Sequence, residues 1–542
     1  MAQLQQTPFK DIALRVAPDS EYEKLVWTLA SILFDDQDSE AYGVPASLGA
    51  QFDNRIRKDR LIAFWEKLSD TSATTAAGEA PNAEERALAY LSGHRIVDAC
   101  DTLVQGKDFR LATLVAQIGG DQLVHEDISN QISDWRTLQI LSEMTEPIRA
   151  LYSLVAGNTC ICEGAKALGP EDRACTFVIS QRFNLDWKRA FGLRLFYAIK
   201  TSDPIEEAVK IFSNDLISDE PAKPFPPFAS ANPSQPDHCE DLLWGLLKLY
   251  AASKDWLPLQ SLASIIAPSN TSSHALDVRL SFQLYHALSL RFPATTNPAA
   301  ADTLAINFAS QLDAKGEWLW AVFAILHLSS AEARKQGIQE LLARHAGDIT
   351  APSFNTSTSS SDYDTWRVLT ADLSVPKPWI YQALALHARA ITQDHVAEVR
   401  YLIFSGDWIT AHDVFRHVVG PSCVIEENWT TLQEILGAFM DRKERISEWG
   451  IGGGVYEDFL PLIKGKTEKE SITRLVDVLP GLAGHGRGCV GFEEMVVLQE
   501  IGNVVGKAVL KIGAEAVSTS FPYYDHAVTE TPFARISILP LH

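Results

Sequence analysis

The sequence has no long apolar run and is poor in positive charge. No uninterrupted apolar stretch among its 542 residues approaches the roughly 20 residues that cross a bilayer, and its start lacks the basic-then-apolar pattern of a secretory signal. There are 47 Lys and Arg against 69 Asp and Glu, for a formal net charge of -22. Nucleic acids and anionic membrane surfaces both attract clustered Lys and Arg. The sequence therefore predicts no membrane insertion and no direct nucleic-acid partner.

Cysteine is sparse and scattered. The 7 cysteines are an odd number spread over a long chain, which fits reduced thiols in the cytosol or nucleus. Cys160 and Cys162 form a single C-x-C motif, with Cys175 further along. No second pair and no His cluster completes a four-ligand set, so we predict no metal site.

Familiar catalytic motifs are missing as well. There is no H-E-x-x-H and no G-x-S-x-G. The glycines at 450–454 lack a preceding strand and the Lys-Ser/Thr of a phosphate loop, so we interpret them as a flexible link between helices. The segment 484–488 is interpreted as a surface loop. His94 and His327 lie in helical patterns that favour structural histidines. We predict no catalytic residue and no cofactor; a dispersed active site would require a polar pocket with perturbed carboxylates.

The informative feature is helical periodicity, and it is clearest from Trp379 to Pro421. Apolar residues recur three and four positions apart, as on one buried helix face. Gly406-Asp407 interrupts this pattern, and Gly420-Pro421 is expected to end it. Apolar residues make up 46% of a chain that is too long for one compact core. Stacked helical hairpins are therefore expected, and such a protein works through its surfaces.

Similar patterns occur along most of the chain. Ser20 and Glu23 are expected to form a capping box before a helix. Polar loops are expected at 69–84, 219–240 and 351–364, and irregular chain at 1–19 and over about the last twenty residues. Late helices are expected at 424–448, 455–464, 467–478 and 490–511. Because strand-like alternation is nearly absent and the helical pattern has no fixed period, we predict an all-α, irregular helical solenoid.

Several of these segments together resemble the nucleoporin ninety-six family. The resemblance rests on SGHRIVDACDTLVQGKDFRLATLVAQIGGD at 92–121, IRALYSLVAGN at 148–158, LDWKRAFGLRLFYAI at 185–199, LDAKGEWLWAVFAILHL at 312–328 and the stretch 379–421. These segments occur in order over roughly 20–450, and the sequence looks like a filamentous-fungal member. Members are the carboxy-terminal product of a self-cleaving precursor and belong to the Y-shaped scaffold complex of the nuclear pore in the nuclear envelope.

The resemblance implies a J- or U-shaped solenoid of the ancestral coatomer element type, with a trunk, a crown and a tail. Mapped here, 1–19 is an extended remnant and 20–85 the outgoing trunk. The crown is 86–260, the returning trunk 261–375 and the tail 376–542. The implied role is that of a structural scaffold subunit, not an enzyme, which supports transport of mRNA and protein.

The resemblance also implies partners. A stem nucleoporin of the same fold binds crown to crown, and two short-arm nucleoporins bind at the hub of the Y through the tail. Family members also donate a β-strand blade to the open β-propeller protein shared with the COPII coat. Residues 1–19 are too short and too weakly alternating for that blade, so we expect the chain to be trimmed relative to the family.

Aromatic and aliphatic residues are the natural candidates for such contacts, although they equally dominate cores. The candidates for the crown interface are Phe183, Leu185, Trp187, Phe191 and Tyr197. Those for the tail interface are Phe404 and Trp408. A COPII-like vesicle-coat scaffold is the alternative function, and it should carry an amino-terminal propeller or a Pro-rich tether.

Overall fold

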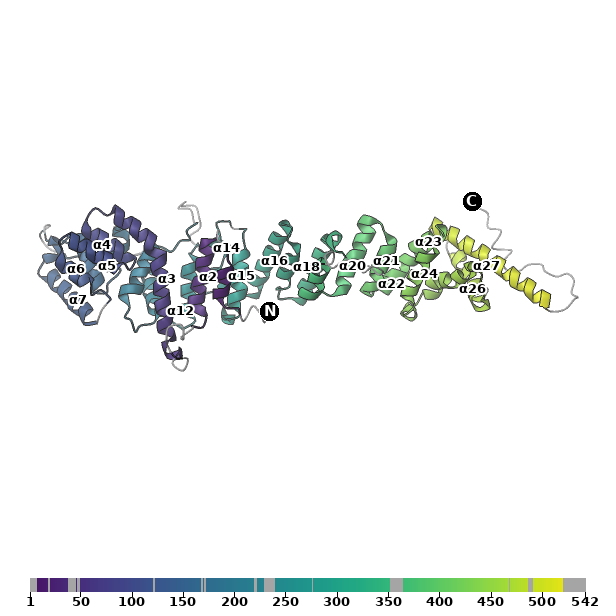
Figure 1. Cartoon of the computed structure of the whole chain (residues 1–542), viewed down its shortest axis with the longest axis horizontal. Helices are drawn as coiled ribbons and strands as arrows, with labels where there is room; N and C mark the ends of the chain where they lie inside the picture. The colour runs from purple at the N-terminus through teal and green to yellow at the C-terminus, as the bar shows by residue number, and fades with distance from the viewer. Residues whose placement is uncertain are drawn as a thin grey trace. The chain divides into compact units, whose positions relative to one another are not determined.

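The computed structural model describes residues 7–17, 20–37, 45, 49–119, 122–166, 169, 172–218, 222–228, 239–274, 276–350, 364–466, 468–485 and 491–519. They are overwhelmingly helical and divide into two compact units, Met1–Gln311 and Leu312–His542. The predicted all-α fold is confirmed (Figure 1).

Unit 1 contains the first helices and one small antiparallel sheet. Its elements are α1 (Phe9–Arg15), α2 (Glu21–Phe34), α3 (Gly49–Glu79), α4 (Ala83–Ser92), α5 (Ile96–Gln105), α6 (Phe109–Val115), α7 (Gln122–Thr137), η3 (Ile140–Glu143), α8 (Glu146–Val155), β1 (Ile161–Cys162), β2 (Phe177–Val178), α9 (Ile179–Arg182), α10 (Trp187–Leu193), the π-helical turn η4 (Arg194–Ala198), α11 (Ile205–Ile217), α12 (Leu242–Ala252), α13 (Leu262–Ile265), α14 (Pro268–Thr271), α15 (Arg279–Ser289), η5 (Pro293–Thr295) and α16 (Pro298–Ala314), which crosses the division.

Unit 2 is built from consecutive helices. They are α17 (Trp318–Ile325), α18 (Ala331–Arg344), η6 (Ala346–Asp348), α19 (Asp364–Arg367), η7 (Val368–Asp372), α20 (Lys377–His387), η8 (Ala388–Thr392), α21 (His395–Ser405), α22 (Trp408–Val414), η9 (Phe415–Val419), α23 (Gly420–Ile425), α24 (Trp429–Phe439), η10 (Lys443–Arg445), η11 (Trp449–Ile451), α25 (Gly453–Ile463), α26 (Lys469–His485) and α27 (Phe492–Thr519). Three of the short segments, η7, η8 and η9, are π-helical turns that end α19, α20 and α22.

The chain of unit 1 folds back on itself. Helix α2 packs against α12 (Figure 1). It is also joined to α15, because Arg279 pairs with the Glu23 carboxylate at 2.5 Å. Just beyond α15, Arg291 pairs at 3.2 Å with Asp35, which follows α2. Early and late segments of unit 1 therefore share one core.

A row of aromatic rings runs through that core. The Trp65 ring of α3 meets Phe191 of α10 at a centroid distance of 4.8 Å. Phe191 meets Phe212 of α11 at 5.6 Å, and Phe212 meets Trp244 of α12 at 5.0 Å. All four side chains are fully buried. Aromatic contacts of this kind add to the hydrophobic stabilisation, so four helices are fixed together by one row of side chains.

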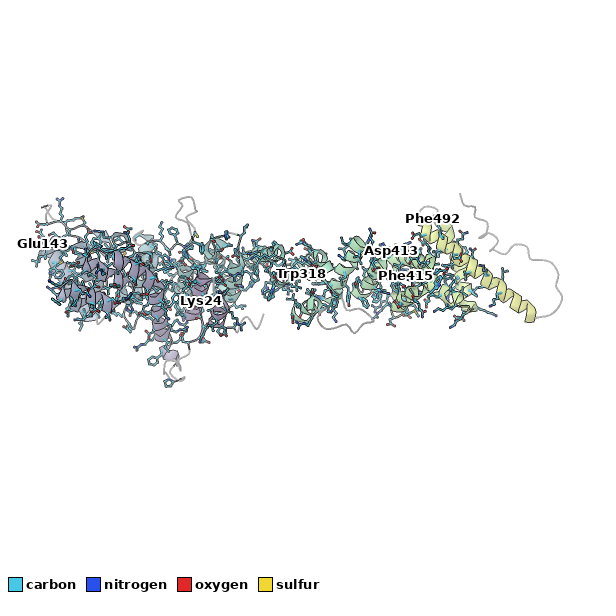
Figure 2. The ribbon with its side chains drawn as sticks, turned by 45° about the horizontal axis from the view of Figure 1, so that its top comes forward. Lys24, Glu143, Trp318, Asp413, Phe415 and Phe492 are labelled. Carbon is cyan, nitrogen blue, oxygen red and sulfur yellow. The ribbon has the colours of Figure 1, made fainter. Side chains whose placement is uncertain are left out.

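Unit 2 has a separate core around its middle helices. Phe415 of η9 packs on Phe439 of α24 at 5.8 Å and on Tyr456 of α25 at 5.4 Å. Phe415, at the centre of this core, is labelled in Figure 2. The turn before this core follows the expected pattern, because Gly406 has a φ of +86° and the Asp407 carboxylate accepts a hydrogen bond from the Thr410 N–H at 3.2 Å. Glycine suits that left-handed conformation, and Asp is a favoured helix cap.

Two expectations for loops were wrong. Residues 69–79 belong to α3, so the expected loop shrinks to the few residues before α4. Ala73 and Ala77 are fully buried, and a Cβ on Gly93 would lie 2.7 Å from the Ala73 Cβ. Small residues therefore serve close helix packing here. Likewise, 9–15 forms α1, because the Asp35 carboxylate accepts the N–H groups of Phe9 and Lys10 at 3.1 Å each.

Local capping also differs from expectation. Ser20 does precede α2, but its side chain makes no capping hydrogen bond, and Glu23 is committed to Arg279 instead. Gly420-Pro421 does not end a helix; it begins α23 directly after a π-helical turn. Proline is tolerated in the first turn of a helix, where its missing N–H is not needed.

The described parts of the other loops agree with expectation, with no helix in 222–228. Residues 351–363 and 520–542 lie outside the described residues, while Asp364, expected as the end of a loop, begins α19. The expected helix at 424–448 is divided into the end of α23, then α24 and η10. The helices expected at 455–464, 467–478 and 490–511 correspond to α25, α26 and α27. Their starts agree within two residues, but α26 and α27 continue to residues 485 and 519, well beyond the predicted ends at 478 and 511.

Candidate protein–protein interfaces

The segment around α10 is held by the core of unit 1. The Asp186 carboxylate caps α10 by accepting a 2.8 Å hydrogen bond from the Arg189 N–H. The Trp65 indole N–H donates to the Lys188 carbonyl at 2.8 Å. The Trp187 ring packs edge-on against the Trp65 ring at 5.9 Å. These contacts turn the apolar face of α10 inward, towards α3.

Four of the five crown candidates consequently lie inside unit 1. They are Leu185, Trp187, Phe191 and Tyr197, all buried. The Tyr197 hydroxyl donates a 3.0 Å hydrogen bond to the Leu91 carbonyl. The fifth candidate, Phe183, is half-buried and packs edge-on against Phe177 at 6.1 Å. The structure thus gives these residues a packing role, and their contact with a partner stays a prediction.

Exposed apolar residues lie elsewhere in the same part of the chain. Helix α7 buries one of its side chains, Ile128, and packs on α8 through an edge-on contact of Trp135 with Tyr152 at 4.9 Å. Leu123, Leu138 and Ile140, on α7 and just beyond it, are exposed. We call these three residues the α7 surface. Sequence reasoning missed it, because an exposed leucine and a buried one look the same in a periodic pattern.

The two tail candidates flank the Gly406 turn. Phe404 is half-buried near the end of α21 and packs against Tyr381 at 5.1 Å. Trp408 begins α22 and packs, half-buried, against the core of unit 2. The next residue, Ile409, is exposed. The structure therefore places both candidates around one turn with part of each side chain accessible.

A second apolar surface in unit 2 lies on α27. One face of this helix packs Val497, Ile501 and Val505 into the core. The other begins with Phe492, which is 74% exposed and labelled in Figure 2, and continues through Met495 and Val496. Glu494 anchors the buried side, since its carboxylate lies 3.1 Å from Nδ1 of His417. We call Phe492, Met495 and Val496 the α27 surface.

Within the glycine segment 450–454, Gly452 and Gly453 are buried in close packing. The Gly453 N–H donates a buried 2.9 Å hydrogen bond to Nε2 of His412. A Cβ on Gly453 would lie 2.4 Å from the Trp449 ring, and one on Gly452 would lie 2.4 Å from His412. Burial lowers the pKa of His412, with a further contribution from the Arg416 charge. These glycines allow close approach between α22 and α25, and the interpretation as a flexible link was wrong.

The other motifs singled out in the sequence have structural surroundings. His94 lies in the turn between α4 and α5 with a φ of 62°, not inside a helix, and its Nδ1 bonds to Glu66. Burial lowers the pKa of His327, whose Nδ1 lies 2.9 Å from the Phe323 carbonyl. Gly484 and His485 belong to the end of α26, and 486–490 lies outside the described residues.

The described residues contain neither a cluster of metal ligands nor a membrane-spanning helix. Within the described ranges, no group of three or more His, Cys, Asp and Glu side chains could hold a metal ion. Cys160 and Cys162 are buried at β1, whereas Cys175 is exposed. No helix of the described chain is long and apolar enough to cross a membrane.

Comparison with known proteins gives the family. The profile of the family described as nuclear protein 96 (Nup96) matches residues 85–387, more than half of the chain. The chain belongs to the Nup96 family. Its curated relatives include nucleoporin nup189 of Schizosaccharomyces pombe, 30% identical over 84% of this chain, and nucleoporin NUP145 of Chaetomium thermophilum, 32% identical over 80%. Nuclear pore complex protein NUP96 of Arabidopsis thaliana is 24% identical over 87%.

Family membership makes the chain a nucleoporin of the nuclear pore complex in the nuclear envelope. The predicted resemblance is therefore confirmed. The aligned region covers 25% of the length of nup189, 21% of NUP145 and 44% of the Arabidopsis protein. This chain thus corresponds to one part of its fungal relatives.

Proposed function

We propose that this Nup96-family chain is a structural scaffold subunit of the Y-shaped coat of the nuclear pore, which supports transport of mRNA and protein. It would act through helix surfaces that bind other nucleoporins. The observation that carries the proposal is the contrast between a large core, closed within unit 1, and the apolar α7 surface that this core leaves exposed. A partner that covered these side chains would remove their apolar area from water, which favours association.

The trunk, crown and tail of the family provide the framework of the proposal. We assign 20–85 to an outgoing trunk, 86–260 to a crown, 261–375 to a returning trunk and 376–542 to a tail. Pairing of Glu23 with Arg279 and of Asp35 with Arg291 supports the trunk assignment, because each pair joins the outgoing segment to the returning one. The division into units at 311/312 falls within the proposed returning trunk.

The α7 surface is our proposed contact for a stem nucleoporin of the same fold. Leu123 and Leu138 lie at opposite ends of α7, so a partner helix laid along α7 would cover both. A stable subunit contact buries more than about 1,000 Å². The aromatic residues of α10 would then support this surface from inside the crown rather than touch the partner.

For the two short-arm nucleoporins we propose contacts in unit 2. The candidates are the partly exposed Phe404 and Trp408 at the Gly406 turn, together with the α27 surface. We do not assign binding of the COPII-shared β-propeller protein to α1. Phe9–Arg15 is a helix capped by Asp35, not a strand that could complete a blade.

Size-exclusion chromatography with light scattering tests the scaffold role. The chain is mixed with the crown-binding stem nucleoporin of the same organism, and a one-to-one complex is expected. Two folded proteins that elute separately would contradict the crown proposal. A matched mixture of the chain with the two short-arm nucleoporins tests the tail in the same way. Phe492→Asp is expected to weaken the complex with the short-arm nucleoporins and to leave the complex with the stem nucleoporin intact.

A further inference from the structure

A groove in unit 1 is lined by α11, α12 and the chain that leads into α13. Its volume is about 400 Å³, within the range of sites that hold small ligands or anchoring side chains. Leu249 of α12 and Ile265 of α13 form a buried apolar floor. Gly245 of α12 allows this floor to form, because a Cβ there would lie 2.7 Å from Cγ2 of Ile265.

The walls of the groove combine polar side chains with accessible apolar ones. Trp256 and Leu257 are half-buried on one side. Ile217, the last residue of α11, stands at the rim and is 81% exposed. So exposed an isoleucine contributes little to the core. Next to an apolar floor, it adds to the surface that an incoming apolar side chain could cover.

The charge of the groove is opposite to that of the chain. Its lining contains Lys210 and Lys248 and no Asp or Glu, although acidic residues outnumber basic ones by 69 to 47 in the sequence. Lys248 is neutralised by Glu240, with 2.7 Å between Nζ and the carboxylate. Nζ of Lys210 lies 5.4 Å from the centroid of the Trp256 ring. In the part of the chain that the structure describes, Lys210 has no carboxylate partner.

We propose that this groove binds a short segment of another protein in which an apolar side chain is flanked by Asp or Glu. The apolar side chain would enter between Ile217 and Leu257, above Ile265. A carboxylate next to it would pair with Lys210. The ammonium of Lys210 lies over the Trp256 ring, so the pair would form at the edge of the apolar site as a charge-assisted hydrogen bond. None of the groove residues belongs to the α7 or α27 surface, so this contact would add to those of the proposed scaffold.

Selection from a random peptide library tests the proposal on the whole chain. A phage-displayed library of short random peptides is panned on the chain, with removal of phages that bind the double variant Lys210→Glu/Ile217→Ser. The enriched peptides are expected to share an apolar residue flanked by Asp or Glu. Absence of enrichment, or enrichment of basic or purely apolar peptides, would overturn the proposal.

Single variants then measure each part of the contact. Lys210→Glu and Ile217→Ser change exposed side chains, so both should fold and keep the proposed stem nucleoporin complex. Each variant is expected to lower the affinity for a selected peptide by about tenfold or more. The matched controls are Lys24→Glu, at an exposed lysine of α2 labelled in Figure 2, and Leu276→Ser, at another exposed apolar residue. If the controls lowered the peptide affinity as much as the groove variants did, the peptide would not bind at this groove.

Discussion

The Tyr22 hydroxyl donates a 2.8 Å hydrogen bond to the Asp241 carboxylate and so joins α2 to the start of α12 across 219 residues of sequence. Asp241 is fully buried, and it also accepts a 3.0 Å hydrogen bond from the Leu243 N–H as the cap of α12. Burial raises the pKa of Asp241 above its ordinary value. One polar contact thus helps to hold the chain where it folds back within unit 1.

Removal of this hydroxyl should weaken unit 1. Tyr22→Phe removes one of the two donors to Oδ1 of the buried Asp241, together with the hydroxyl that accepts the Leu242 N–H at 3.3 Å. We therefore expect a loss of about 1.5–3 kcal/mol in the free energy of unfolding. The measurement is urea denaturation followed by circular dichroism. Tyr90→Phe is the control, because the Tyr90 hydroxyl has no hydrogen-bond partner among the described residues, and it should change stability by less than about 0.5 kcal/mol. Equal effects of the two changes would show that the Tyr22–Asp241 bond contributes nothing specific.

Acid should destabilise unit 2 through His412. The folded pKa of His412 lies below its ordinary value of 6.5, so the folded state favours the neutral ring that accepts the Gly453 N–H. This stabilisation is complete above the ordinary pKa and is lost as the pH falls through the lower folded pKa. The measurement compares melting temperatures at about pH 7.5 and about pH 5.5.

His412→Gln should reduce that pH dependence, because glutamine can accept the same hydrogen bond and does not titrate. The exposed His274 provides the control, and His274→Gln should leave the pH dependence as it is. If the melting temperature of His412→Gln falls between the two pH values as much as that of the unaltered chain, His412 is not the source of the acid destabilisation.

A methyl group added at two glycines of unit 2, Gly453 and Gly437, should change the free energy of unfolding in opposite directions. In Gly453→Ala the new Cβ would meet the Trp449 ring at 2.4 Å, so we expect a loss of about 1–3 kcal/mol from overpacking. Gly437 lies inside α24 with nothing within 4 Å of an added Cβ. Gly437→Ala should therefore gain up to about 1 kcal/mol. Chemical denaturation gives the free energy of unfolding of both variants. If Gly453→Ala left that free energy unchanged, α25 could shift away from Trp449 without cost, and the packing argument would be wrong.

The sequence predicts the helical class well because most helices bury one face, and burial of one face produces the observed periodicity. Turns with a specific backbone requirement are also predictable, as at Gly406-Asp407. Prediction fails where a local signal is overruled by distant contacts. Asp35, just after α2, caps α1, and Arg279 draws Glu23 away from the expected capping box. Such partners cannot be identified from neighbouring residues.

The candidate interface residues show a different limit. Periodicity marks Trp187, Phe191 and Leu138 alike as apolar, yet the first two are buried and Leu138 is 66% exposed. Exposure depends on whether another part of the same chain covers the residue. The α7 surface and the groove beside Trp256 are therefore visible only in the folded chain, whereas the family could be recognised from short segments in order.

Titration calorimetry with the crown-binding stem nucleoporin tests the central claim most directly. Leu138→Asp should keep the helical content of the chain and weaken the complex by about tenfold or more, while Leu276→Asp, at a residue that is 88% exposed outside the α7 surface, should bind like the unaltered chain. Trp187→Ala should instead lower the free energy of unfolding by about 3–5 kcal/mol, as expected for a buried aromatic. If Leu138→Asp binds normally while Trp187→Ala folds normally and loses the complex, the partner contacts α10 and our assignment of the crown interface is wrong.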